Sequence, residues 1–331
     1  MLIRREKELW EVVVPAKVNL FLEVVGRRKD GYHDLDTVMM GVSLCDHLRF
    51  RATEDEELRL DVLPITANGF DKLSDDDNAW EIPCDSRNLV IRALESVRGR
   101  LGIAKGMHVE LIKEIPAQAG LGGGSADAAA AITGGMLAWL GEFRRKEAIE
   151  LASGLGSDIN FFIEGRAAVA DKGTWLAHCV GRGELVRPIS SNWELDMVVI
   201  HPPLGCSTKS VFHALTASDL PGRETKTADA IVRAIEKQDK PLLANELFNR
   251  LELPASAENP WIDIMREHLA QEPCVLGACI SGSGSAMVAV VENAEQAIQI
   301  AARMKEKMKV RAYAVRSWQA PSIHEQMSTI N

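Results

Sequence analysis

A glycine-rich stretch, residues 116–130, carries the pattern with the clearest chemical meaning in this 331-residue chain. Four glycines fall within five positions, and Ser125 follows them directly. Glycine lets backbone N–H groups converge on one point, because no Cβ blocks the approach. The alanine-rich continuation predicts a helix over residues 124–140, whose free N–H groups and positive dipole end would face that point. The pattern predicts an anion site, most commonly for a nucleotide phosphate. The alternative is a turn that lets a helix pack closely.

Two familiar phosphate loops do not fit this stretch. A P-loop needs Lys followed by Ser or Thr directly after its last glycine, whereas Gly124 is followed by Ser125 and Ala126. A dinucleotide-binding fingerprint needs Gly-x-Gly-x-x-Gly and an acidic residue about 20 residues later. Gly122, Gly124 and Glu142 match that pattern only with the wrong glycine spacing. The β-rich start of the chain also lacks the βαβ halves of such a fold.

Composition limits the kinds of partner. The formal net charge of −9 argues against a nucleic acid or an anionic membrane as the main partner. The first eight residues are charged where a signal peptide would be apolar, and the most apolar stretch, residues 126–140, is too short to span a bilayer. Six cysteines are scattered without a Cys-x-x-Cys pair, so neither disulfides nor a zinc site is expected. We therefore expect a reduced, cytoplasmic protein.

Hydrophobic periodicity predicts an α+β fold in two domains, residues 1–190 and 191–331. Strands are expected at residues 9–14, 20–25, 37–44, 47–52, 57–62, 107–112, 167–170, 176–179, 185–189, 195–200, 274–280, 286–291 and 310–315. Helices are expected at residues 88–101, 124–140, 146–153, 209–215, 227–237, 241–251, 261–270 and 294–308. Pro15 opens a kink between the first two strands, residues 26–33 form a turn, and residues 64–85 form an acidic surface loop.

The glycine-rich stretch resembles the phosphate loop of the GHMP kinases, the superfamily of galactokinase, homoserine kinase, mevalonate kinase and phosphomevalonate kinase. Residues 15–20 (Pro-Ala-Lys-Val-Asn-Leu) and 277–284 (Gly-Ala-Cys-Ile-Ser-Gly-Ser-Gly) resemble two further motifs of that superfamily, in the same order. The resemblance implies an N-terminal ATP-binding and catalytic domain and a C-terminal domain that completes the substrate site. In that superfamily the turn at residues 281–285 supports the nucleotide loop.

Within the superfamily, the motifs are most similar to those of the 4-diphosphocytidyl-2-C-methyl-D-erythritol kinases of the non-mevalonate isoprenoid pathway. They are Lys17-x-Asn19-Leu20, Asp30-Gly31-Tyr32-His33, Gly156-x-Asp158-Ile159, Gly181-Arg182-Gly183-Glu184 and Asn249-x-Leu251-Glu252. This similarity spans roughly residues 10–315. It implies ATP and Mg²⁺ as cofactors and phosphorylation of the 2-hydroxyl of a small substrate, methylerythritol linked to cytidine diphosphate.

The resemblance also implies the nucleotide and catalytic residues. ATP would bind at Pro116, Ala117, Gln118, Ala119, Gly120, Leu121, Gly122, Gly123, Gly124, Ser125 and Ala126. Asp158 would accept or orient the hydroxyl proton, with Lys17 beside it. By residue type alone, an aspartate placed like Asp158 is more often a helix cap than a catalyst, and a lysine placed like Lys17 is more often solvated. Their separation in sequence does not show that they meet.

For the acceptor, the resemblance implies Asn19, Tyr32, His33, Thr208 and Phe212. Aromatic rings can stack on cytosine and an imidazole can bond to its edge; the alternatives are a hairpin tip for residues 32–33 and a core position for residue 212. The basic run Arg27, Arg28 and Lys29 could meet the diphosphate, but a solvated turn is the favoured interpretation. No protein ligand for a metal is assigned.

The chain departs from the family pattern at four places. Ala126 stands where a second serine is common, and Asn160 stands where a proline is usual. Residues 64–85 and 171–180 are interpreted as insertions.

Two other functions stay open: a kinase for another small alcohol, such as homoserine or a sugar, and a non-catalytic nucleotide or metabolite sensor. The Gly31-Tyr32-His33 turn argues against the first, and the presence of both Lys17 and Asp158 argues against the second.

Overall fold

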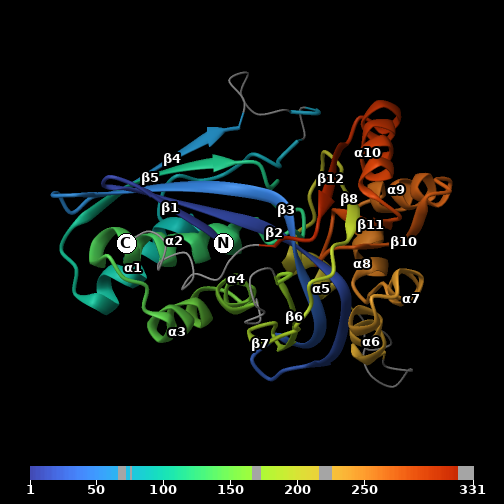
Figure 1. Cartoon of the computed structure of the whole chain (residues 1–331), viewed down its shortest axis with the longest axis horizontal. Helices are drawn as coiled ribbons and strands as arrows, with labels where there is room; N and C mark the ends of the chain where they lie inside the picture. The colour runs from blue at the N-terminus through green and yellow to red at the C-terminus, as the bar shows by residue number, and fades with distance from the viewer. Residues whose placement is uncertain (66–71, 75–76, 166–172, 216–225, 320–331) are drawn as a thin grey trace.

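The computed structural model describes residues 1–65, 72–74, 77–165, 173–215 and 226–319. Two β-sheets with helices packed on them make an α+β fold (Figure 1), as the sequence predicts. The strand expected at residues 167–170 lies outside the described residues.

The larger sheet holds the N-terminal strands. The strand order is β1-β2-β3-β5-β4. In addition, β6 pairs with β3 and β7 pairs with β6, while β9 pairs in parallel with β2. The strands are β1 (Leu2–Glu6), β2 (Leu9–Arg27), β3 (His33–Thr53), β4 (Leu58–Pro64), β5 (Gly106–Lys113), β6 (Leu176–Gly181), β7 (Leu185–Pro188) and β9 (Phe248–Asn249).

Strands β2 and β3 correct the expectation of several short strands. Each is continuous, with 19 and 21 residues respectively, and they pair as one long antiparallel hairpin. Pro15 does not break β2: it pairs with Cys45 of β3, and the strand register shifts directly after it, an irregularity at which proline is tolerated. The turn predicted between the two strands is present, and Gly31 adopts a φ of +88° there.

In the part of the chain that the structure describes, the larger sheet is accompanied by α1 (Leu89–Leu101), α2 (Gly123–Leu140), α3 (Arg145–Leu155) and α4 (Ile159–Glu164). The first three match predicted helices, whereas α4 was not predicted. Figure 1 shows α1 and α2 on the same side of this sheet, and α2 packs on β2 and β3. The side chain of Asn88 caps α1 by accepting a hydrogen bond from the Val90 N–H.

The smaller sheet has the order β10-β11-β8-β12. Its strands are β8 (Asp196–His201), β10 (Val275–Ile280), β11 (Met287–Val291) and β12 (Arg311–Arg316). The helices of this half are α5 (Thr208–His213), α6 (Asp229–Lys237), α7 (Lys240–Glu246), α8 (Glu252–Glu258), α9 (Trp261–Ala270) and α10 (Ala294–Met308). The single helix expected at residues 241–251 is wrong: α7 ends at Glu246, and the chain then forms β9 at the edge of the larger sheet.

One hydrophobic core joins the two sheets. Apolar side chains of β2 and β3, such as Val18 and Met40, share it with Met197, Val199 and Val288 of the smaller sheet. A second core fills the space under α1 and α2, and a third lies between the smaller sheet and helices α9 and α10. None of the helices in the described residues is long and apolar enough to cross a membrane.

Part of the acidic segment 64–85 is not the surface loop that its composition predicts. Asp77 and Ala79 are buried, and Asp77 forms an ion pair with Arg311 of β12. The segment therefore ties the first half of the chain to β12, near the end of the second half.

Candidate active site

The glycine-rich loop has the predicted form, between β5 and the start of α2. Gly120 and Gly122 both adopt the left-handed region, with φ of +75° and +71°. A Cβ on Gly120 would lie 1.9 Å from the Ser281 carbonyl oxygen, so only glycine allows this loop to contact the turn at residues 281–285. Helix α2 begins at Gly123, one residue before the predicted start. Its open N-terminus faces the cavity described below.

Lys17 and Asp158 meet beside this loop. The Lys17 ammonium lies 3.3 Å from Asp158 Oδ2 and donates a hydrogen bond of 2.6 Å to Asn19 Oδ1. The lysine side chain is 4% exposed and the aspartate side chain 27%, so the cation is enclosed while the carboxylate stays accessible. Asp158 precedes α4 at the cap position, but its side chain makes no capping hydrogen bond. The carboxylate is therefore available to the cavity.

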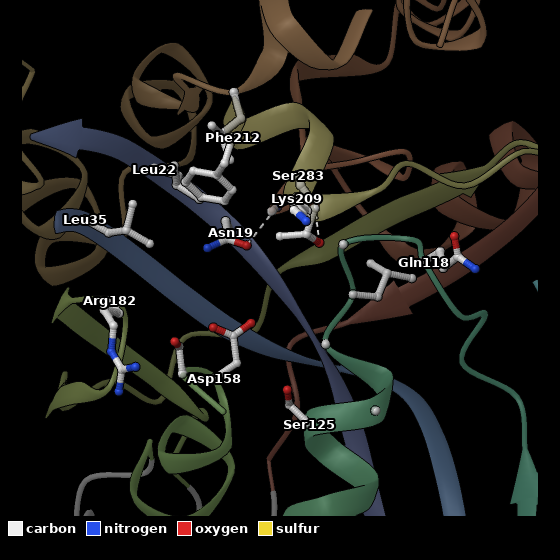
Figure 2. A pocket seen from close by; sticks show the side chains of 18 of the residues that line it. Asn19, Leu22, Leu35, Gln118, Ser125, Asp158, Arg182, Lys209, Phe212 and Ser283 are labelled. Carbon is white, nitrogen blue, oxygen red and sulfur yellow. Dashed lines mark hydrogen bonds between the residues drawn. The ribbon is translucent and has the colours of Figure 1, made fainter. Parts of the chain in front are cut away.

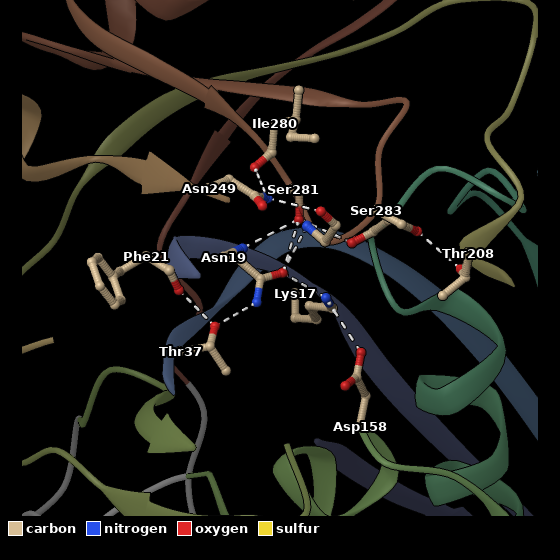
Figure 3. Close-up of polar contacts among 12 residues, drawn as sticks. Lys17, Asn19, Phe21, Thr37, Asp158, Thr208, Asn249, Ile280, Ser281 and Ser283 are labelled. Atoms are coloured by element: carbon tan, nitrogen blue, oxygen red, sulfur yellow. Dashed lines mark hydrogen bonds and ion pairs between the residues drawn. The ribbon is translucent and has the colours of Figure 1, made fainter. Parts of the chain in front are cut away.

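Asn19 connects three parts of the chain (Figure 3). Its fully buried amide oxygen accepts hydrogen bonds from the Lys17 ammonium and, at 2.9 Å, from the Gly282 N–H. Its amide nitrogen donates a hydrogen bond of 2.8 Å to Thr37 Oγ1.

The turn at residues 281–285 makes further contacts with the site. Ser281 Oγ donates to the Gly120 carbonyl at 2.9 Å. Asn249, the last residue of β9 and the first of its motif, donates to the Ile280 and Gly282 carbonyls. The turn at residues 281–285 thus supports the glycine loop, as expected, and through Asn19 it also holds Lys17.

A cavity of about 1160 Å³ contains these groups (Figure 2). Ten consecutive loop residues from Pro116 to Ser125 line it, together with Lys17 and Asp158. All five residues expected at the acceptor also line it: Asn19, Tyr32, His33, Thr208 and Phe212. Ala126 does not, because it is fully buried and its N–H donates to the Gly122 carbonyl within α2. Its N–H is thus already paired in the first turn of the helix.

The aromatic side chains that are expected to contact cytosine contact each other or a cation in this structure. The His33 and Phe212 rings stack on each other, with centroids 5.2 Å apart and planes 26° apart. Burial, and to a smaller degree the charge of Arg27, lowers the pKa of His33. Tyr32 is 54% exposed, with the Arg182 guanidinium 5.0 Å from its ring centroid. Their use as base-stacking partners stays a prediction.

The charge of the lining residues suits anionic ligands. Among the described residues that line the cavity, four are cationic, whereas Asp158 is the single carboxylate. The four cations are Lys17, Arg27, Arg182 and Lys209.

Sequence reasoning gave Arg182 and Lys209 no role, although both stand in stretches that it singled out. Arg27 reaches the cavity, whereas Arg28 pairs with Asp30 and Asp34 on the turn.

A buried ionic cluster lies under the start of α2. The Lys113 ammonium, 2% exposed, forms ion pairs with Asp46 and Asp127, the latter at 2.8 Å. It lies so close to the loop that a Cβ on Gly123 would be 3.0 Å from its Nζ. Burial, reinforced by Asp46 and opposed by Lys113, raises the pKa of Asp127 well above its usual range. The cluster fixes the last residues of β5 against α2.

The substitution of Asn160 for a proline is explained by local contacts. Its buried amide donates hydrogen bonds to Ser153 Oγ and to the Glu184 carbonyl, which link α4 to α3 and to the turn before β7. A proline could not make these bonds. The turn after Asp158 is therefore held by side-chain hydrogen bonds.

Phosphoryl transfer to a small hydroxylated molecule is the chemistry that suits a phosphate loop beside an enclosed lysine and an accessible carboxylate. The class is that of the GHMP kinases: the model of the GHMP kinases N terminal domain matches residues 88–166, and that of the GHMP kinases C terminal region matches residues 231–310.

The chain belongs, within this class, to the family of 4-diphosphocytidyl-2-C-methyl-D-erythritol kinases. It is 37% identical over 292 residues to the enzyme of that name from Pelotomaculum thermopropionicum, an alignment that covers 88% of this chain and 92% of that one. It is 32% identical to the corresponding Shouchella clausii protein, covering 86% of each.

Solved structures agree with this assignment. A crystal structure of 4-(cytidine 5'-diphospho)-2C-methyl-D-erythritol kinase superposes with a TM-score of 0.71 and 28% identity, covering 93% of this chain and 99% of that one. The mevalonate kinase of L. major shares the fold, with a TM-score of 0.66 at 15% identity over 96% of this chain and 97% of that one.

Proposed function

We propose that the protein transfers the γ-phosphoryl group of ATP to the 2-hydroxyl of 4-diphosphocytidyl-2-C-methyl-D-erythritol, a step of the non-mevalonate route to isopentenyl diphosphate. The names of its relatives supply the substrate. The observation that carries the chemistry is the Lys17–Asp158 pair, 3.3 Å apart, at the edge of the glycine loop and inside the same cavity.

Each part has a role in the transfer. Backbone N–H groups of residues 120–125 and the N-terminus of α2 hold the ATP phosphates. Asp158 accepts the proton of the acceptor hydroxyl, whose oxygen forms the new bond to the γ-phosphorus while the bond to the β–γ bridging oxygen breaks and ADP leaves. The Lys17 ammonium stabilises the negative charge on the transferring group.

Mg²⁺ would accompany the nucleotide. Figure 2 shows Asp158 between Arg182 and Ser125, so a carboxylate and a hydroxyl border the region where the phosphates would lie. Mg²⁺ in phosphotransfer sites is commonly held by one or two carboxylates, waters and the phosphates themselves, and this donor set fits that pattern. The described residues contain no group of three His, Cys, Asp or Glu side chains that could hold a metal without the nucleotide. Bound Mg²⁺ would neutralise phosphate charge.

The acceptor would occupy the part of the cavity beyond Asp158. Its diphosphate would meet Arg182 and Lys209, and its cytosine would contact Tyr32, His33 and Phe212. Arginine binds phosphate oxygens through two parallel N–H groups, whereas lysine acts as a point charge. Because His33 and Phe212 stack on each other, a base between them would have to separate the two rings.

The test is ADP release by the purified protein with ATP and Mg²⁺, with and without the cytidyl substrate. We expect strong stimulation by that substrate and little by homoserine, mevalonate or galactose. Stimulation by one of these alcohols alone would refute the proposed acceptor while leaving the enzyme class intact.

A further inference from the structure

Residues 77–79, here called the strap, lie between the glycine loop and the segment 204–206. The Ala79 carbonyl accepts a hydrogen bond of 2.9 Å from the Ala117 N–H, at the start of the glycine loop. Asn78 Oδ1 accepts one of 3.2 Å from the Gly205 N–H. One side of the strap therefore holds the nucleotide loop, and the other holds the segment that leads into α5.

The two segments that the strap joins also touch each other. The Cys206 N–H donates to the Gln118 carbonyl at 3.2 Å, and a Cβ on Gly205 would lie 2.7 Å from Gln118 Cβ. Figure 2 shows Gln118 on the far side of the loop from Arg182. The segment 204–206 therefore packs directly on the loop at Gln118.

The strap is firmly anchored behind this contact. The Asp77 side chain is fully buried and forms an ion pair with Arg311 of β12, whose guanidinium lies 5.1 Å from the Trp80 ring centroid. The two carboxylate oxygens also accept hydrogen bonds from the Leu73 and Ala79 N–H groups, at 2.8 and 3.1 Å. The smaller sheet thereby fixes the conformation in which Asn78 faces Gly205.

The segment held by Asn78 leads to the acceptor side of the cavity. Ser207 caps α5 by accepting from the Ser210 N–H, and Thr208, the first residue of α5, shares a hydrogen bond of 2.9 Å with Ser283. Phe212 and Lys209 of the same helix line the cavity. A displacement of Gly205 would therefore shift these side chains of α5 together.

We propose that Asn78 is a positioning residue that holds the acceptor-side helix α5 in a fixed place relative to the nucleotide loop. This inference rests on the proposed function, since it concerns the acceptor of that reaction. Asn78 acts through Gly205 and does not touch the reacting atoms. Because the Ala79–Ala117 bond uses backbone atoms alone, a change of the Asn78 side chain acts on the acceptor side and spares ATP binding.

The test compares Asn78→Ala with Asn78→Asp and with Asn192→Ala. Asn192 is exposed and accepts a side-chain hydrogen bond of 3.1 Å from Gln238, so its truncation removes a comparable bond away from the cavity. We expect Asn78→Ala to raise the KM for the cytidyl substrate about 3- to 10-fold, the usual effect of one hydrogen bond, with the Kd of ATP within about twofold of wild type. Asn78→Asp retains an oxygen acceptor and should restore the KM.

A second measurement separates this proposal from the proposed function. Amide hydrogen exchange in a peptide that covers residues 204–208 should become faster in Asn78→Ala, while the peptide at residues 117–121 keeps its protection. Unchanged exchange at residues 204–208, or equal losses in ATP and acceptor affinity, overturns the positioning role. A wild-type protein that the cytidyl substrate does not stimulate refutes the proposed function instead.

Discussion

In the proposed reaction, the loop at residues 120–125 would bind ATP through backbone N–H groups, which no single side-chain change removes. Proton acceptance would instead depend on one side chain, the Asp158 carboxylate beside Lys17. Asp158→Asn should therefore lower the rate of transfer by about 10²- to 10⁴-fold and leave ATP affinity nearly unchanged. Single-turnover ADP formation and nucleotide titration measure the two quantities. Asp263→Asn, an exposed change on α9, is the matched control; a variant at 158 that keeps full turnover would show that the base lies elsewhere.

The cluster of Lys113, Asp46 and Asp127 makes a second residue-level prediction, about pH. Asp127 has a raised pKa, so the folded state binds a proton that the unfolded state has released, between the usual Asp range and that raised value. The free energy of unfolding contributed by this group therefore falls as pH rises through that window, by at most about 1.4 kcal/mol per pH unit. Asp127→Asn removes the titration, so its stability relative to wild type should rise with pH in denaturant unfolding. Parallel stability curves for the two proteins would contradict this.

Lys113→Met removes the cation of the same cluster instead of a carboxylate. It leaves Asp46 and Asp127 facing each other in the core without their shared cation. Breaking a buried ion pair in this way costs about 3–5 kcal/mol, so chemical denaturation should show a loss of that size at neutral pH. A loss below about 1 kcal/mol would mean that the cluster contributes little to holding β5 against α2.

At the scale of elements, the close approach of α2 to the larger sheet depends on glycine. A Cβ on Gly134 would lie 2.3 Å from the ring of Phe50, which is fully buried on β3. Gly134→Ala should therefore lower stability by about 1–3 kcal/mol through overpacking, although alanine favours helix. Gly99→Ala on α1 is the matched control, because Gly99 is exposed and has open space around it, and it should raise stability by about 0.5–1 kcal/mol. Thermal unfolding of both variants measures whether each substitution raises or lowers stability. If both raised it or both lowered it, the packing argument would be contradicted.

The elements also show which parts of the fold sequence patterns could predict. The glycine loop and the helices α1, α2, α3, α5, α6, α9 and α10 were predicted, because glycine clusters, alanine runs and helical periodicity act over a few residues. Continuity of β2 through Pro15 was not, because a bulge depends on the partner strand and proline alone signals a break. Likewise Ala126 reads as a loop residue by its place in the motif, but its N–H belongs to the hydrogen bonds within α2.

The candidate site was predicted in parts but not as an assembly. The resemblance named Lys17 and Asp158, while their 3.3 Å contact depends on how β2 and α4 pack. The strap was not predicted, for a physical reason. Residues 77–79 lie in an acidic stretch that is typical of a solvated loop, and Arg311, the ion-pair partner of Asp77, is more than 230 positions away. Composition reports the average environment of a segment and carries no information on a single buried ion pair.

At the scale of the molecule, the two sheets share a core, so the two halves of the sequence should not unfold separately. Val18 and Met40 from the larger sheet pack with Met197 and Val199 of β8, and β9 returns from the second half to pair with β2. Chains of this length often unfold through intermediates, so a single transition is a demanding expectation.

Met197→Ala tests this shared core directly. Met197 is fully buried, and its truncation should cost about 2–5 kcal/mol. If the halves unfold together, the denaturation midpoint shifts by the same amount whether followed by circular dichroism, by tryptophan fluorescence or by loss of nucleotide binding. If the second half unfolds on its own, the variant instead splits the transition, and nucleotide binding at the loop of residues 116–125 persists after the first step. If the curves from the three probes coincide within each protein, nucleotide binding lasts only as long as both halves remain folded.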